Sequence, residues 1–108
     1  MKRNICYIML LIFILLPACT RQNPVKAKEN TEISMAMVEK GKVEDAVKGF
    51  KKAVQYDKKN ADAHYNLALA YYLNNDFKKA DEELKMAIKY KPDHKEAKEM
   101  LKSFKRLE

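Results

Sequence analysis

The sequence predicts an all-α fold: a short α-solenoid of two 34-residue helix–turn–helix repeats and a C-terminal capping helix. The first observation is self-similarity at a lag of 34 residues, which aligns residues 27–60 with residues 61–94 and pairs Ala46 with Ala80. A fixed period of this size indicates a repeat fold, in which each unit buries its apolar face on the next. The second observation is that apolar residues recur at helical spacing within each unit. The expected helices lie near residues 26–39, 43–56, 61–73, 77–90 and 95–106.

The first unit, residues 27–60, has the weaker pattern. The residues that fit are Ile33, Ser34, Met37, Gly41, Ala46, Phe50 and Ala53. Terminal repeats are often atypical because their outer face meets water. We therefore interpret this unit as an N-terminal capping repeat.

The second unit, residues 61–94, has the clearer pattern. One apolar stripe consists of His64, Leu67, Ala68 and Tyr71, and a second of Phe77, Ala80, Leu84, Ala87 and Ile88. The run Asn74-Asn75-Asp76 predicts a turn in which Asp76 caps the following helix. Pro92 then stops that helix.

The order of these residues resembles the tetratricopeptide repeat. That family's pattern is a large aromatic residue, Leu-Gly, Tyr, Ala, an aromatic residue, Ala and Pro. In those places this chain has His64, Leu67-Ala68, Tyr71, Ala80, Leu84, Ala87 and Pro92. His64 and Leu84 depart from the pattern, as Asn30 and Lys58 do in the first unit. The resemblance covers residues 27–108 and implies binding rather than chemistry.

The last segment, residues 95–108, predicts one helix with an apolar stripe and a lysine-rich opposite face. The stripe consists of Ala97, Met100, Leu101, Phe104 and Leu107. This segment resembles the solvating helix that closes such repeat arrays.

The first 18 residues resemble the cleaved signal peptide of a bacterial lipoprotein. Lys2-Arg3 precedes an apolar run from Ile5 to Leu16, whose 12 residues, at about 1.5 Å each, are too short to cross a bilayer comfortably. Leu16-Pro17-Ala18-Cys19 resembles a lipobox, although Pro17 is not the usual second residue. This resemblance implies cleavage before Cys19 and acylation, such as palmitate, on Cys19. An ordinary cleaved signal and an uncleaved anchor are the alternatives.

The predicted mature chain is a lipid-anchored domain of the bacterial cell envelope. Thr20 is not the Asp of the inner-membrane retention signal, which favours the outer membrane where the source has one. Residues 19–26 are expected to form the lipidated tether. The formal charge falls from +7 to +5 without residues 1–18, and acidic residues are interleaved with the lysines. This pattern fits solvated helix faces, with attraction to anionic lipid or an acidic partner as the alternative. We expect no nucleic-acid partner.

The sequence predicts no enzyme, cofactor or metal site. No Gly-rich phosphate loop, Ser/His/Asp order or metal-ligand spacing stands out. His64 is expected to replace a core aromatic residue and His94 to lie in a loop. Asp62 and Glu82-Glu83 are expected to be surface charges.

The family's ligand-facing positions imply a binding groove. On the two first helices these positions include Lys28, Thr31, Asp62 and Leu73, with an apolar set that we predict to bind a partner: Met35, Val38, Tyr65, Leu69 and Tyr72. The alternative is that this apolar set packs within the domain or under the tether. The family's two-carboxylate clamp is not expected. Asn66 occupies one clamp position, but the others hold Thr31, Met35, Glu96 and Met100.

The function predicted from the sequence is a membrane-anchored module that binds a protein or peptide partner in an envelope complex. The alternative is a self-associating structural scaffold, a homo-oligomer without a separate ligand.

Overall fold

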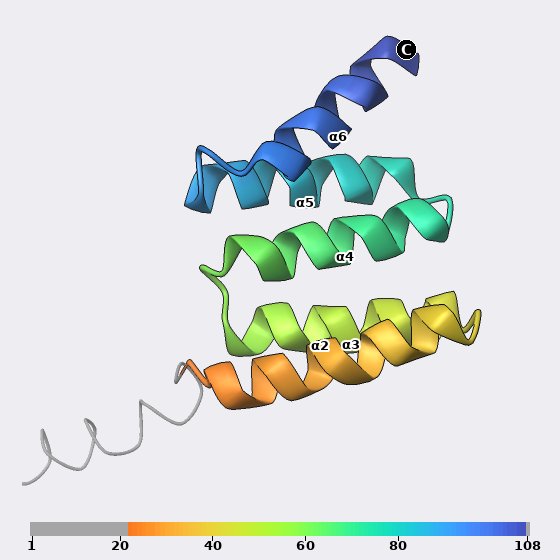
Figure 1. Ribbon diagram of the computed structural model, residues 1–108, viewed down its shortest axis with the longest axis vertical. Helices are drawn as coiled ribbons and strands as arrows, with labels where there is room; N and C mark the ends of the chain where they lie inside the picture. The colour runs from red at the N-terminus through yellow and green to blue at the C-terminus, as the bar shows by residue number, and fades with distance from the viewer. Residues whose placement is uncertain (1–21, 108) are drawn as a thin grey trace, which may run out of the picture.

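The computed structural model describes residues 22–107, which form five α-helices and no strand. The helices are α2 (Pro24–Glu39), α3 (Val43–Tyr56), α4 (Ala61–Leu73), α5 (Phe77–Tyr90) and α6 (Lys95–Leu107). They stack in chain order, with α2 against α3, α3 against α4, α4 against α5 and α5 against α6 (Figure 1). The predicted all-α solenoid of two helix pairs and a closing helix is confirmed. The predicted signal peptide and Cys19 lie outside the described residues.

The start of α2 differs from the prediction. The helix begins at Pro24 because proline suits the first helical position and the Asn23 side chain accepts a hydrogen bond from the Lys26 N–H at 3.1 Å. Residues 24–26, predicted as tether, therefore lie in the first turn of α2. Asn23, just before them, contacts the end of α3, since its N–H donates to the Tyr56 carbonyl at 2.8 Å.

Two apolar clusters hold the stack together. The first joins α2, α3, α4 and α5 around Phe50, Leu67, Tyr71 and Ala80. The second joins α4, α5 and α6 around Ala68, Leu84, Ala87 and Ala97. Ala80 and Ala87, which the sequence places in the apolar stripe of α5, are fully buried, as is Leu84. Ile33, in contrast, is 49% exposed, because it lies on the outer face of the first repeat.

Equivalent turns end α2 and α4. Gly41 and Asn75, which the 34-residue register pairs, have φ values of 75° and 62°, in the left-handed region. Glycine and asparagine tolerate this conformation better than other residues. The same turn therefore recurs with different residues, and Asp76 caps α5 as predicted, accepting from the Lys79 N–H at 3.4 Å. Within residues 22–107, none of the helices has the length and apolar character needed to span a bilayer.

Candidate functional site

A polar hollow of about 290 Å³ lies between the first halves of α2 and α4. Its polar lining consists of Lys28, Thr31, Asp57, Asn60, Asp62 and Asn66. Three of these residues, Lys28, Thr31 and Asp62, are at positions that the repeat register predicted to face a ligand. The hollow is therefore the part of the expected groove that the structure shows as an open space.

The polar side chains of the hollow differ in whether they already form hydrogen bonds within the chain. Asn60 accepts from the Ala63 N–H at 3.1 Å and donates to Asp57 at 3.0 Å, and Thr31 donates to the Ala27 carbonyl at 2.9 Å. Asn66 makes no hydrogen bond with the described part of the chain and is half-buried. Its amide is thus free to both donate and accept within the hollow.

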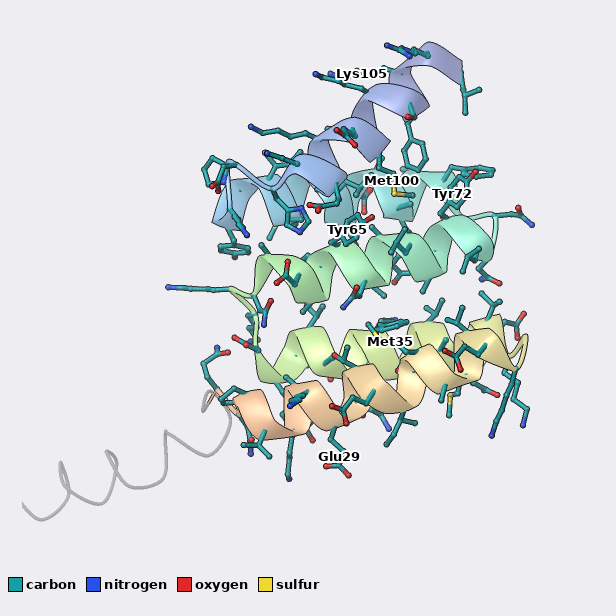
Figure 2. The ribbon with its side chains drawn as sticks, in the orientation of Figure 1. Glu29, Met35, Tyr65, Tyr72, Met100 and Lys105 are labelled. Carbon is teal, nitrogen blue, oxygen red and sulfur yellow. The ribbon has the colours of Figure 1, made fainter. Side chains whose placement is uncertain are left out.

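In the structure, the five residues of the predicted apolar binding set do not form one exposed stripe. Met35 is 46% exposed on α2, and Val38 packs against the first core cluster. Tyr65 and Tyr72 point from α4 toward α6, where Met100 lies beside them (Figure 2). Leu69, between them on α4, is half-buried. The five residues are on the expected helices, but only some of them are open to a partner.

Contacts within the chain cover Tyr65 and part of Tyr72, whose side chain stays 41% exposed. Tyr65 packs against the second core cluster, with its ring 5.0 Å from that of His94. Tyr72 stacks on Phe104 of α6 at 5.7 Å between ring centroids and contacts Phe77 edge-on at 5.5 Å. Helix α6 covers this face because its apolar stripe must be buried on something, and the α4 rings offer a matching surface.

His94 connects α6 to α4. It was predicted as a loop residue, and it does lie between α5 and α6, but it is buried. Its Nδ1 accepts from the Ala97 N–H at 3.3 Å, which caps α6, and its Nε2 lies 3.0 Å from an oxygen of Asp62. Asp62 is therefore both a lining residue of the hollow and a partner of the α6 cap, rather than an isolated surface charge.

His64 is the buried ring that the sequence predicted, and it has polar partners on both sides. Its Nε2 donates to the Lys58 carbonyl at 2.8 Å, and its Nδ1 lies 2.6 Å from an oxygen of Glu83. The ring also stacks on Tyr90 at 5.5 Å. Glu83, predicted as a surface charge, is therefore part of a buried contact between α4 and α5.

The charges near Tyr65 are acidic. Burial raises the pKa of the Tyr65 phenol above its ordinary value, and the negative charges of Glu96 and Glu99 raise it further. With Asp57 and Asp62 in the hollow, carboxylates border the α2–α4–α6 face. In residues 22–107 there is no group of three or more His, Cys, Asp or Glu side chains that could hold a metal ion.

Two family models match the chain. A model described as TPR repeat matches residues 36–75, and one described as tetratricopeptide repeat matches residues 61–94. The chain contains tetratricopeptide repeats. No curated protein matches it significantly.

Solved tetratricopeptide domains share the fold. The first TPR of Spaghetti (RPAP3), bound to the HSP90 peptide SRMEEVD, superposes with a TM-score of 0.69 at 22% identity, over 71% of this chain and 61% of that chain. The second TPR of Spaghetti, with the same peptide, gives 0.66 at 23% identity, over 69% of each chain. This chain thus spans about three fifths of the first of these domains. At such identities the likeness shows the fold.

Proposed function

We propose that this protein is a membrane-anchored lipoprotein whose tetratricopeptide domain binds a peptide or helix of a partner protein in an envelope complex. The observation that carries the proposal is the hollow between α2 and α4, in which the Asn66 amide has no partner among the described residues. A peptide backbone offers both donors and acceptors to such an amide. Met35, exposed on α2, adds an apolar contact beside it.

The recognised peptide differs in charge from the one bound to Spaghetti. The HSP90 peptide SRMEEVD is acidic at its end, whereas the hollow here is lined by two carboxylates, Asp57 and Asp62, against one lysine, Lys28. Like charges brought together in a partly desolvated site oppose binding. The partner segment is therefore neutral or basic where it meets the hollow.

Partner recovery from membranes tests the groove. Asn66→Arg fills the hollow with a long side chain, and Gln55→Arg makes a comparable change at an exposed position on α3. Full-length protein is isolated from solubilised membranes, and co-purifying proteins are compared by mass spectrometry. We expect a partner with the native chain and with Gln55→Arg, and its loss with Asn66→Arg. Recovery of only a second copy of the chain would support the scaffold alternative instead.

The anchor is supported by the basic start, the short apolar run and Cys19. Two or more acyl chains hold a protein stably on a bilayer where one chain does so only marginally. Mass spectrometry of the membrane-extracted protein should find acyl groups on Cys19, and Cys19→Ser should block both lipidation and normal processing. A processed, water-extractable protein with a free Cys19 thiol would contradict the anchor.

A further inference from the structure

Large apolar side chains gather between the start of α5 and the later turns of α6. Phe77 and Leu107 are 51% and 81% exposed, and Phe104, whose ring centroid lies 6.3 Å from that of Phe77, is half-buried. We name these three residues, which line one hollow, the end patch. Exposed apolar residues scattered singly need no explanation, but a contiguous group indicates an interaction surface.

The end patch borders a hollow of about 480 Å³ between α5 and α6. Phe77, Lys78 and Asp81 line it from α5, and Phe104 and Leu107 line it from α6. Helix α6 crosses α5 near its own start and leans away toward its C-terminal end (Figure 1). The hollow lies on this diverging side, and it is separate from the groove between α2 and α4.

The repeat register indicates what shape fits the hollow. Moving its lining residues back by 34 positions gives Val43, Glu44, Val47, Ala70 and Leu73. Of these, Val47 and Ala70 are buried in a cluster that also contains Ala80 of α5. The equivalent surface between α3 and α4, one repeat earlier, is therefore covered by an α-helix, α5.

The charge around the hollow indicates what kind of helix fits. Helices α5 and α6 together carry nine Lys and Arg against five Asp and Glu, whereas α2 and α4 carry two against four. In the hollow, Asp81 is paired with Lys85 at 2.6 Å. Lys78 has no ion pair within residues 22–107. An incoming helix is thus attracted if its polar flank is acidic.

We propose that the end patch is a second docking surface, which takes an acidic amphipathic α-helix from a different protein. Its apolar stripe enters the α5–α6 hollow and contacts Phe77, Phe104 and Leu107. Its carboxylates face Lys78. This surface is separate from the α2–α4 hollow, so one domain can hold two segments at once.

A peptide titration tests the proposal. The probe is a fluorescently labelled peptide with the sequence of α5, residues 77–90, in which every lysine is replaced by glutamate; the same peptide with its lysines is the control. The full chain is held in nanodiscs of zwitterionic lipid, and binding is followed by anisotropy. We expect the acidic peptide to bind about ten-fold more tightly than the control. Lys78→Glu and Leu107→Asp should each weaken it by about ten-fold.

Matched variants separate this surface from the rest of the molecule. Val25→Asp changes a similarly exposed apolar residue on α2 and should bind as the native chain does. Asn66→Arg should also leave peptide binding unchanged. Circular dichroism checks that Leu107→Asp keeps its helices. Equal affinity for the two peptides, or native affinity in Leu107→Asp, would overturn the proposal. A native dimer that Leu107→Asp converts to a monomer in light scattering would also overturn it, because a second copy would then cover the patch.

Discussion

His64 shows how a polar ring occupies a core position of a repeat. A carbonyl oxygen can only accept, so the Nε2 of His64 carries the proton that it donates to Lys58. The short Nδ1–Glu83 contact places a second proton between the ring and the carboxylate. This arrangement fits an imidazolium, and burial of the ring is offset by two acceptors.

The stability of the domain should therefore fall as the pH rises above neutrality. Burial lowers the pKa of His64, but the hydrogen bond to Glu83, the Lys58 carbonyl and the charge of Glu83 outweigh it, so the net pKa lies above 6.5. A raised histidine pKa contributes stability fully below the unfolded value, and this contribution is lost as pH rises through the folded value. Melting temperatures measured between about pH 6 and about pH 9 should decline in the native chain and stay flatter in His64→Gln. Identical pH profiles for the two would contradict this.

The sequence could place both histidines but not their partners. The repeat register puts His64 in the core and His94 in the connection before the last helix, and both placements hold. Glu83 and Asp62, however, lie 19 and 32 residues away along the chain from their histidines. Their carboxylates have the spacing of ordinary surface charges, and only the packing of α4 against α5 and of α6 against α4 brings them to the rings.

At the scale of elements, the α2–α3 pair depends on one close approach. A Cβ added to Gly49 would overlap the Ser34 hydroxyl and lie 3.2 Å from the Ser34 Cβ. Ser34 is fully buried, and its hydroxyl donates to the Asn30 carbonyl at 2.6 Å. At this point α2 and α3 therefore pack through small residues.

Gly49→Ala should destabilise the domain by up to about 2 kcal/mol. Overpacking costs about 1–3 kcal/mol, and the better helix propensity of alanine returns part of that, about 1 kcal/mol. Urea denaturation of Gly49→Ala, Ser34→Ala and the double variant measures the coupling. We expect Gly49→Ala to cost less in the Ser34→Ala background, because the overlapping hydroxyl is gone. An equal loss of stability in both backgrounds would mean that the strain does not come from overlap with the Ser34 hydroxyl.

The position of α6 was the least predictable element. Its apolar stripe could be read from the sequence, and four of its members, Ala97, Met100, Leu101 and Phe104, do face the clusters. The pattern gives the buried face of a helix but not its crossing angle or its neighbours. For that reason the sequence left open whether Tyr65 and Tyr72 face a partner or pack within the domain, and in the structure α6 covers Tyr65 and part of Tyr72. Tyr72→Ala therefore reports on α6 packing as well as on binding.

At the scale of the whole molecule, the domain has two separate candidate surfaces. The groove lies between α2 and α4, and the end patch lies between α5 and α6 at the far end of the stack (Figure 1). Asp57 and Asp62 outnumber Lys28 in the lining of the groove, whereas Asp81 in the α5–α6 hollow is paired with Lys85 and leaves Lys78 as the charge that an incoming segment meets. An anchor at Cys19 would hold the α2 end near the membrane and leave α6 toward the surroundings.

Site-specific photo-crosslinking in native membranes tests directly whether the α2–α4 groove binds a partner. A photoreactive amino acid replaces Asn66 in the groove or, as the control, the exposed Gln55 on α3. We expect position 66 to give a discrete crosslinked band that contains a different protein, and position 55 to give none. The same band from both positions, or only crosslinks between copies of this chain from position 66, would contradict binding of a partner in the groove.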